Sequence, residues 1–272
     1  MLRMDDRVDG RPLALARIGI GLAGLLNVGE SWVVLMGVDA PGALAMPALD
    51  GLPAATGTTG AVLASLGASA AIFVTLGLGT RIAALVLAVT LGSMMLLEQQ
   101  VYSNHVALSM WCALWLVLSR SDARWSLRSR VDGPRDVLVA DQILLMTQVS
   151  VVYAFTGLLK INPEFLSGAV IQENSRLPLS DPLAQVMAVA AVLTEVSLCV
   201  GLWFRRTRLW VACAGVGLHA AIPLVMYQPL PLVSFSISVV CLYPLFFARP
   251  VHGRSEDVGQ RVGAGRAASV IA

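Results

Sequence analysis

The sequence predicts an all-α fold, a polytopic membrane bundle of about eight transmembrane helices with both termini on the cytoplasmic side. Hydrophobic residues make up 57% of the 272-residue chain and charged residues 13%, and the mean hydropathy is +0.75. Soluble domains hold roughly half apolar and a quarter charged residues. The apolar residues gather in long runs, and the basic residues lie almost entirely between alternate runs. These observations exclude an ordinary soluble domain.

Eight apolar runs approach the length of a transmembrane helix, which needs about 20 residues to cross roughly 30 Å of hydrocarbon. The second and third runs are separated only by GLGTR, and although they could form one re-entrant or kinked unit, we favour two helices. We divide the chain into a cytoplasmic N-terminus (1–11), a transmembrane domain (12–248) and a disordered cytoplasmic tail (249–272) rich in Gly, Arg and Ala. The runs are 12–36, 58–78, 81–98, 103–119, 138–160, 182–203, 207–227 and 231–247.

The arginines predict the orientation, because Lys and Arg in short loops are retained on the cytoplasmic side. With the N-terminus inside, sixteen of the nineteen basic residues fall in inner segments. The outer loops hold only Lys160 and Arg176, and Arg17 lies within the first run. The segment MLRMDDRVDGR does not resemble a cleaved secretory signal, so we expect the first helix to remain in the mature protein. The pattern predicts a multi-pass protein in the lipid of a cell membrane, the bacterial cytoplasmic membrane.

Several classes of site are not indicated. The net charge of +2 is spread over the loops, so no nucleic-acid partner is expected. The four cysteines lie inside apolar runs and form no C-x-x-C pair, which argues against a dithiol or metal centre. The chain has no H-E-x-x-H, nucleophile elbow or phosphate loop. We therefore predict no metal cofactor.

The stretch VYAFTGLLKINPEFLSG contains the only lysine of the chain, Lys160, at the outer end of the fifth run. Tyr153, Thr156, Gly157 and Lys160 recur at helical spacing and share one face, where the glycine permits close approach of a helix or ligand. A lysine at a helix end can simply snorkel to the interface. An arginine would snorkel equally well, whereas only an ammonium can lose its proton when desolvated. The pattern favours a site that needs a neutral amine as a base.

Other polar residues are predicted to lie at a depth in the membrane similar to that of Lys160. Their depth follows from the helical rise of about 1.5 Å per residue, counted from the outer end of each run. Asn104 and His105 open the fourth run, Glu30 lies in the outer part of the first, and His219 lies in the outer half of the seventh. A lone intramembrane histidine is also typical of a structural hydrogen bond between helices. Their coincidence in one layer predicts a binding site that includes Lys160.

Two further charged residues lie deeper, toward the cytoplasmic side. Arg17 and Glu195 are expected to neutralise each other as a structural ion pair, because an unpaired charge in the membrane is costly.

Three blocks of sequence stand out together. They are YAFTGLLKINPEFLSGAVIQEN, which joins an aromatic-rich helix to Gly and Lys, SNHVALSMW, which carries an Asn-His pair, and GLHAAIPLVMYQPLPLVSFSISVVCLYPLFF near the end of the apolar sequence. These blocks resemble the lysine motif, the Asn-His segment and the late helices of one family, the HTTM (horizontally transferred transmembrane) domain, whose best-known member is the vitamin K-dependent gamma-carboxylase. The likeness spans most of residues 10–248.

The resemblance implies a function. Lys160 would be the general base that deprotonates a reduced quinone, vitamin K hydroquinone or menaquinol, with His105 and Asn104 as its partners. Two features depart from the carboxylase: Asn162 stands where it has an acid, and the large lumenal portion that binds the protein substrate is missing. Carboxylation would then need a peptide or a second protein chain to supply substrate binding.

The leading interpretation is a membrane enzyme that uses Lys160 on a quinol or another lipid-soluble substrate near the outer face. Tyr153, Thr156, Gly157, Glu30 and His219 would line its binding site. One alternative is a non-catalytic maturation or immunity partner of an exported peptide, which would not need a lone lysine on a polar face. Another is a proton-coupled carrier that uses the buried acids and histidines, which are Glu30, His105, Glu195 and His219.

Overall fold

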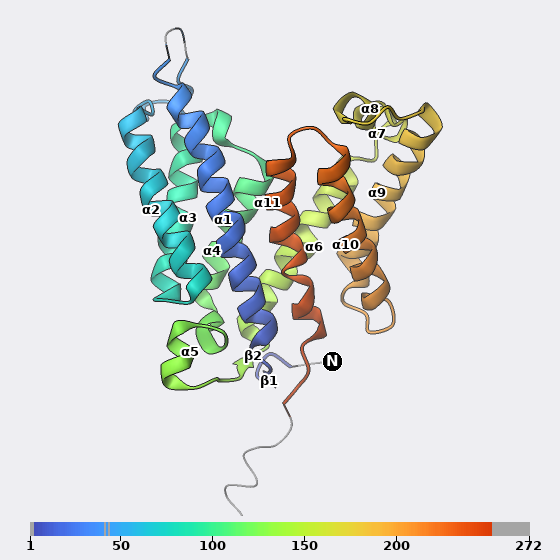
Figure 1. The fold of residues 1–272 in the computed structure, drawn as a ribbon. Coiled ribbons are helices and arrows are strands. Elements are labelled where there is room, and N and C mark those ends of the chain that lie inside the picture. The colour runs from blue at the N-terminus through green and yellow to red at the C-terminus, as the bar shows by residue number, and fades with distance from the viewer. Residues whose placement is uncertain (1–2, 41, 43, 252–272) are drawn as a thin grey trace, which may run out of the picture.

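The computed structural model describes residues 3–40, 42 and 44–251, and these form a bundle of long helices (Figure 1). The tail expected to be disordered lies largely outside the described residues, from 252 onward. The elements are β1 (Arg7–Val8), α1 (Arg11–Gly37), α2 (Gly57–Leu76), α3 (Thr80–Leu97), η1 (Gln99–Val101), α4 (Asn104–Leu118), η2 (Ser121–Ala123), α5 (Leu127–Asp132), β2 (Val137–Leu138), α6 (Ala140–Leu159), α7 (Pro163–Leu166), α8 (Ala169–Asn174), α9 (Asp181–Gly201), α10 (Arg208–Val225), α11 (Pro229–Val240) and η3 (Tyr243–Phe247).

The all-α membrane fold is confirmed, and each of the eight predicted runs coincides with an apolar helical segment. Within the described residues, seven segments are long and apolar enough to cross a membrane: α1, α2, α3, α6, α9, α10, and α11 continued by η3. The eighth, α4, has 15 residues, which rise about 22 Å and so fall short of roughly 30 Å of hydrocarbon. The number of helices of full spanning length is therefore one fewer than the number of runs.

The second and third runs form two separate helices, as favoured from the sequence. Gly77 ends α2 with φ +72°, and its backbone N–H bonds back to the carbonyls of Phe73 and Val74. Gly79 follows with φ +54° immediately before α3. Glycine adopts this left-handed conformation without a steric penalty, so two glycines two residues apart reverse the chain in a tight turn.

Both ends of the described chain lie at one end of the bundle, below the helices in Figure 1. Strand β1 pairs antiparallel with β2, and Val8 also forms a bridge with Pro250. The backbone N–H of Val251 donates to the carbonyl of Arg7 at 2.9 Å. Segment α5 and the loop between α9 and α10 lie at this end too, and with them most of the arginines, so we call it the arginine-rich end. Helices α7 and α8 lie at the opposite end.

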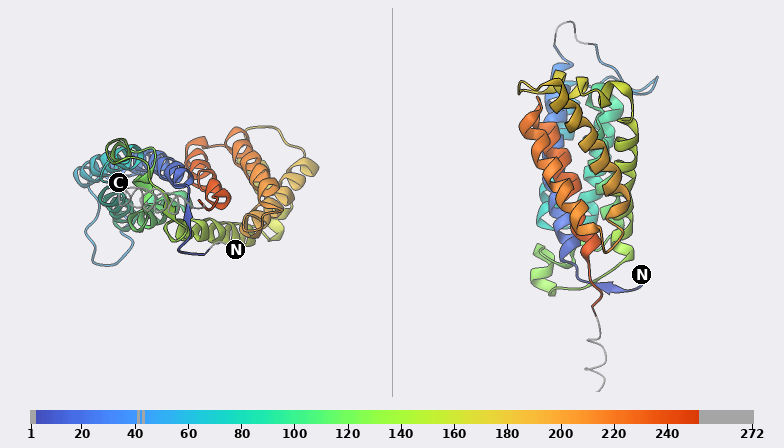
Figure 2. Two further views of the ribbon diagram at one scale, coloured as in Figure 1. Left: turned by 90° about the horizontal axis from the view of Figure 1, so that it is seen from below. Right: turned by 90° about the vertical axis from the view of Figure 1, so that its right-hand side faces the viewer.

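The helices form two groups joined through α11 (Figure 2). Helices α1 to α4 pack together on one side, and α6, α9 and α10 pack on the other. Helix α11 contacts both α1 and α10, and α4 contacts α6. Polar side chains that face inward from these helices therefore gather at two different places.

The arrangement predicts a shared location for both termini. Reporter domains fused before Arg7 and after Val251 should report the same compartment, because β1 and Pro250 are bridged, and the positive-inside rule makes that compartment the cytoplasm. A reporter inserted between α8 and α9 should report the other side. Alkaline phosphatase and fluorescent-protein fusions measure this directly, and termini on opposite sides would contradict the fold.

Candidate functional site

Lys160 lies at the end of α6, where the chain is forced to turn. Pro163 disfavours helical backbone at the preceding residue, and Asn162 is extended, with its side-chain oxygen accepting from the N–H of Phe165 at 2.9 Å. Helix α6 therefore ends at Leu159, and Lys160 follows as its C-cap. The lysine Nζ lies 5.7 Å from the centre of the Phe165 ring, which is close enough for a cation–π contact.

The partner of Lys160 is Glu195 of α9. Nζ donates to Oε1 at 2.5 Å, and the lysine side chain is 30% exposed whereas the glutamate side chain is 3% exposed. Gly157 makes this contact possible, because a Cβ there would lie 3.1 Å from a methyl group of Val196 and 3.5 Å from the Cβ of Glu195. A larger residue at 157 would push α9 away from the end of α6.

A buried hydrogen-bond chain lies on the same face of α6, about two turns before Lys160. The hydroxyl of Tyr153 is 2.7 Å from Nε2 of His219 on α10, and it also bonds the hydroxyl of Tyr243 in η3. All three rings are buried. Together with Lys160 and Glu195 they form what we call the lysine cluster, which joins α6, α9, α10 and η3.

Three buried polar atoms of this region have no hydrogen-bond partner within the described residues. They are Oε2 of Glu195, Nδ1 of His219 and Oγ1 of Thr156. Buried polar groups are normally paired, so unpaired ones indicate a bound water or ligand group, or a chemical role. The lysine cluster can therefore accept and donate hydrogen bonds to a molecule that enters it.

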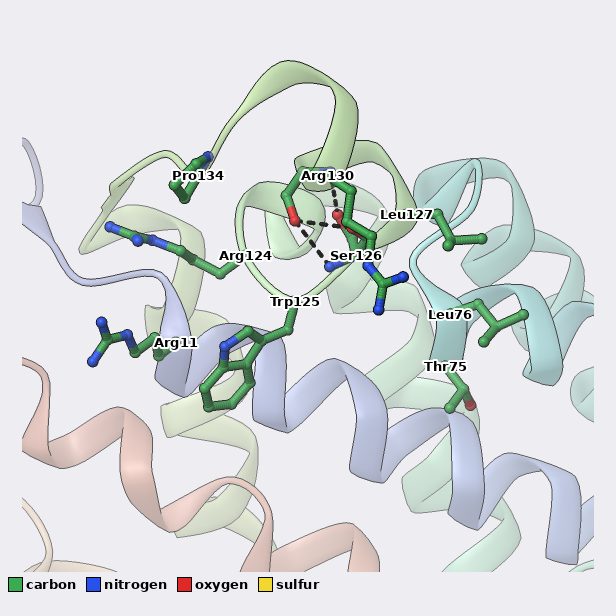
Figure 3. Close-up of a pocket in the computed structure, with 10 residues that line it drawn as sticks. Arg11, Thr75, Leu76, Arg124, Trp125, Ser126, Leu127, Arg130 and Pro134 are labelled. Atoms are coloured by element: carbon green, nitrogen blue, oxygen red, sulfur yellow. Dashed lines mark hydrogen bonds between the residues drawn. The ribbon is translucent and has the colours of Figure 1, made fainter.

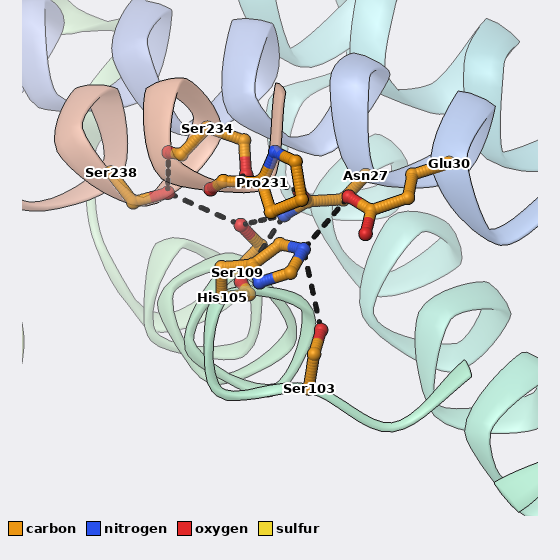
Figure 4. A network of polar contacts seen from close by, with 8 residues as sticks. All are labelled: Asn27, Glu30, Ser103, His105, Ser109, Pro231, Ser234 and Ser238. Carbon is orange, nitrogen blue, oxygen red and sulfur yellow. Dashed lines mark hydrogen bonds and ion pairs between the residues drawn. The ribbon is translucent and has the colours of Figure 1, made fainter. Parts of the chain in front are cut away.

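A second polar group, the histidine cluster, lies between α1, α4 and α11 (Figure 4). Nε2 of His105 lies 2.8 Å from Oε2 of Glu30, and the hydroxyl of Ser103 lies 3.3 Å from the same nitrogen. The histidine side chain is largely buried and the glutamate is partly exposed. The structure thus brings together two residues that the sequence placed in one layer.

Asn27 is the centre of the histidine cluster and is not among the site residues predicted from the sequence. Its amide nitrogen donates to the carbonyl of His105 at 3.1 Å and to the hydroxyl of Ser109 at 2.6 Å. Its amide oxygen accepts from Ser234 at 2.6 Å, and Ser109 lies 3.3 Å from Ser238. A signal was present in the sequence, because Asn27 lies three residues before Glu30 and so shares its face of α1.

The predicted site residues are divided between these clusters. Within the described residues, no hydrogen bond or ion pair joins His105 to Lys160, which pairs with Glu195 instead. Asn104 is exposed at the start of α4, and its side chain forms no hydrogen bond among the residues that the structure describes. His219, placed in the outer half of its run, contacts Tyr153.

The expected ion pair between Arg17 and Glu195 is wrong. Arg17 donates from Nη2 to the carbonyl of Trp125 at 2.5 Å, at the arginine-rich end, while Glu195 pairs with Lys160. The depth of each residue in the membrane was predicted from its distance to the end of its apolar run. That prediction assumes that all the runs end at the same level. Helix α9 instead begins near α7 and α8, beyond the end of α6 (Figure 1). Glu195 therefore packs beside the last turn of α6, where a Cβ at Gly157 would lie 3.5 Å from its own Cβ, and it reaches Lys160.

A bundle of membrane-length helices with two polar clusters in its interior defines a multi-pass membrane protein. The sequence model of the HTTM domain matches residues 6–249, nearly the whole chain, and the chain therefore belongs to the HTTM domain family. This confirms the resemblance and relates the protein to the membrane domain of the vitamin K-dependent gamma-carboxylase. Comparison with curated proteins and with solved structures gives no match.

The unequal burial of the ion pair predicts unequal costs of breaking it. Lys160→Met leaves the nearly inaccessible Glu195 carboxylate without a partner and should lower the free energy of unfolding by about 2 kcal/mol, roughly 4–8 °C in melting temperature. Glu195→Gln leaves a lysine that can reach water and should cost less. The double variant should recover part of the loss. Melting curves in detergent measure this, and equal, additive losses would show that the two side chains do not interact.

The histidine cluster predicts that Asn27 matters for stability and Asn104 does not. Asn27→Leu removes three hydrogen bonds and leaves buried partners unpaired, at a cost of about 1–3 kcal/mol. Asn104→Leu is the matched control, because it changes an exposed side chain on α4. The melting temperature should fall only for the first variant, and similar melting temperatures for the two would contradict the network.

Proposed function

We propose that this protein is a membrane enzyme that removes a proton from a hydroxyl group of a lipid-soluble quinol, using Lys160 and Glu195 together as the base. We place it in the bacterial cytoplasmic membrane. The observation that carries the proposal is the 2.5 Å contact between a partly exposed amine and a buried carboxylate that keeps one oxygen unpartnered. Family membership supports it, since the chain is related to a carboxylase membrane domain.

The ion pair requires a proton to move before Lys160 can act. As an ammonium the lysine has no lone pair, so its proton first passes to Oε1 of Glu195, with which it is in contact. The neutral amine then takes the proton of the substrate hydroxyl: one O–H bond breaks and one N–H bond forms. The pair ends as an ammonium beside a carboxylic acid, with one proton more than before, and the substrate leaves as an anion. Loss of a proton from Glu195 to water restores the pair.

His219 can stabilise the anion. When Tyr243 donates to Tyr153 and Tyr153 donates to Nε2 of His219, neutral His219 carries its hydrogen on Nδ1, which has no partner within the described residues. A fixed donor in a water-poor site stabilises developing negative charge more than water does. Thr156 offers a second hydroxyl on the face of α6 that carries Lys160.

An apolar substrate is supported by a groove that meets the lysine cluster at Tyr243. The groove has a volume of about 830 Å³, lies between α1, α10 and α11, and is lined almost entirely by apolar side chains such as Leu22, Val216 and Phe247. Tyr243 lines it too, and the hydroxyl of this tyrosine bonds Tyr153. The apolar tail of a quinol would lie in this groove.

The proposal predicts that neither member of the pair can be replaced. Lys160→Arg keeps a positive charge but offers no lone pair near neutral pH, and Glu195→Gln cannot take the lysine proton. Each change should reduce turnover about 10²–10⁴-fold, which is the usual cost of losing a general base. Glu164→Gln, an exposed change four residues after Lys160, should leave turnover unchanged.

The assay uses protein reconstituted in liposomes with vitamin K hydroquinone or with menaquinol in air-saturated buffer, where dissolved oxygen is the oxidant of the deprotonated quinol. Mass spectrometry measures the oxidised product formed above that of protein-free liposomes. Normal melting temperature for Lys160→Arg separates a chemical defect from misfolding. Full activity of Lys160→Arg would eliminate the base. A wild-type chain that turns over neither quinol would eliminate the quinol as substrate.

A further inference from the structure

A basic hollow lies at the arginine-rich end (Figure 3), and its lining residues belong to neither polar cluster. It has a volume of about 570 Å³ and lies between the start of α1, the end of α2 and the segment from η2 through α5. Among the described residues, the charged ones that line it are Arg11, Arg124 and Arg130, and none is acidic. The hollow therefore has the electrostatic character of an anion site.

The arginines of the hollow are only partly neutralised by neighbouring acids. Arg124 contacts Asp136 at 3.0 Å and Asp9 at 3.8 Å, and Arg11 contacts Asp9 at 3.6 Å. Arg130 forms no ion pair within the part of the chain that the structure describes.

Arg128, which does not line the hollow, differs from Arg130 because it is paired with acidic residues. The hydrogen bond to Asp132 and the nearby charge of Asp122 raise the pKa of Arg128. Its charge is therefore already matched by acids, unlike that of Arg130.

A buried arginine adds positive charge beneath the hollow. Arg17 is inaccessible to solvent, and its Nε and Nη1 have no hydrogen-bond partner within the described residues. Its guanidinium lies against Gly77 and Ser126, and it donates to the carbonyl of Trp125. Both Trp125 and Ser126 line the hollow. Asp122 is a nearby acid that partly offsets this buried charge. Because burying a cation is costly, a further negative charge bound in the hollow would be favourable.

The geometry points to a phosphate group as the occupant, and we propose that it belongs to an anionic phospholipid. Arginine donors match phosphate oxygens well. In Figure 3 the guanidinium groups of Arg11 and Arg124 lie on one side of Trp125 and that of Arg130 lies on the other, so the hollow offers arginine donors on both sides. Basic pockets at the ends of membrane helices suit acidic lipid headgroups. This site is separate from the proposed catalytic function and does not depend on it.

The surroundings favour a lipid phosphate over a dissolved one. The hollow lies where α1 begins and α2 ends, which is the level of the headgroups if these helices span the membrane. Leu76, Trp125 and Leu127 line it and are 46%, 54% and 39% exposed. Tryptophan is enriched at the membrane interface, and exposed leucines beside a basic pocket would contact acyl chains.

The test compares exposed arginines inside and outside the hollow. The full-length chain is purified and exchanged into nanodiscs or detergent with phosphatidylglycerol, with phosphatidylcholine, or with inorganic phosphate alone. Native mass spectrometry measures bound lipid, and melting curves measure stabilisation. The variants are Arg11→Gln and Arg130→Gln, and the matched control is Arg205→Gln, an exposed change at the same end that does not line the hollow.

We expect the wild type to retain phosphatidylglycerol in preference to phosphatidylcholine. Each hollow variant should weaken that retention about fivefold, because one surface arginine contributes about that factor toward anionic lipid, whereas Arg205→Gln should not. Equal weakening by all three variants would overturn the proposal, since it would indicate non-specific charge attraction. Full stabilisation by inorganic phosphate without lipid would also overturn it, because the site would then take a free anion.

Discussion

The ion pair between Lys160 and Glu195 is the interaction on which the rest of the structure depends. A carboxylate that is almost inaccessible to solvent in a membrane bundle is tolerated only beside a cation or a ligand. The sole lysine of the chain supplies that cation from the end of α6, where Asn162 and Pro163 stop the helix. Close packing at Gly157 then fixes the distance between α6 and α9. The contact between Lys160 and Glu195 therefore depends on three features: the opposite charges, the end of α6 and the close packing of α6 against α9.

Two polar clusters follow from the way α11 joins two groups of helices. The histidine cluster ties α1 to α4 and α11 through Asn27, and its hydrogen bonds are well satisfied. The lysine cluster retains unpartnered atoms on Glu195 and His219 among the described residues. A satisfied network stabilises helix packing, whereas an unsatisfied one is suited to binding. This difference is why we assign the chemistry to the lysine cluster and a structural role to Asn27.

The sequence predicts the elements of this fold better than their contacts. The hydropathy of the sequence predicted the position of every apolar helical segment. The spacing of Tyr153, Gly157 and Lys160 predicted that they share one face of α6. Both predictions succeed because they depend only on local sequence periodicity. The partners of Lys160 and Arg17 depend on how far each helix is shifted along the bundle. The chain between α6 and α9 forms α7 and α8 at the end of the bundle. This connection shifts α9 along the bundle axis relative to α6, and the periodicity of the sequence does not predict that shift.

Because the chain has one lysine, isotope labelling of lysine isolates the central contact. Solid-state NMR on protein in lipid, with ¹⁵N on lysine side chains and ¹³C on glutamate carboxylates, measures the dipolar coupling between Nζ of Lys160 and nearby carboxylates. The account predicts a strong coupling that disappears in Glu195→Gln and persists in Glu164→Gln. A wild-type protein without this coupling, or a coupling that survives Glu195→Gln, would contradict it.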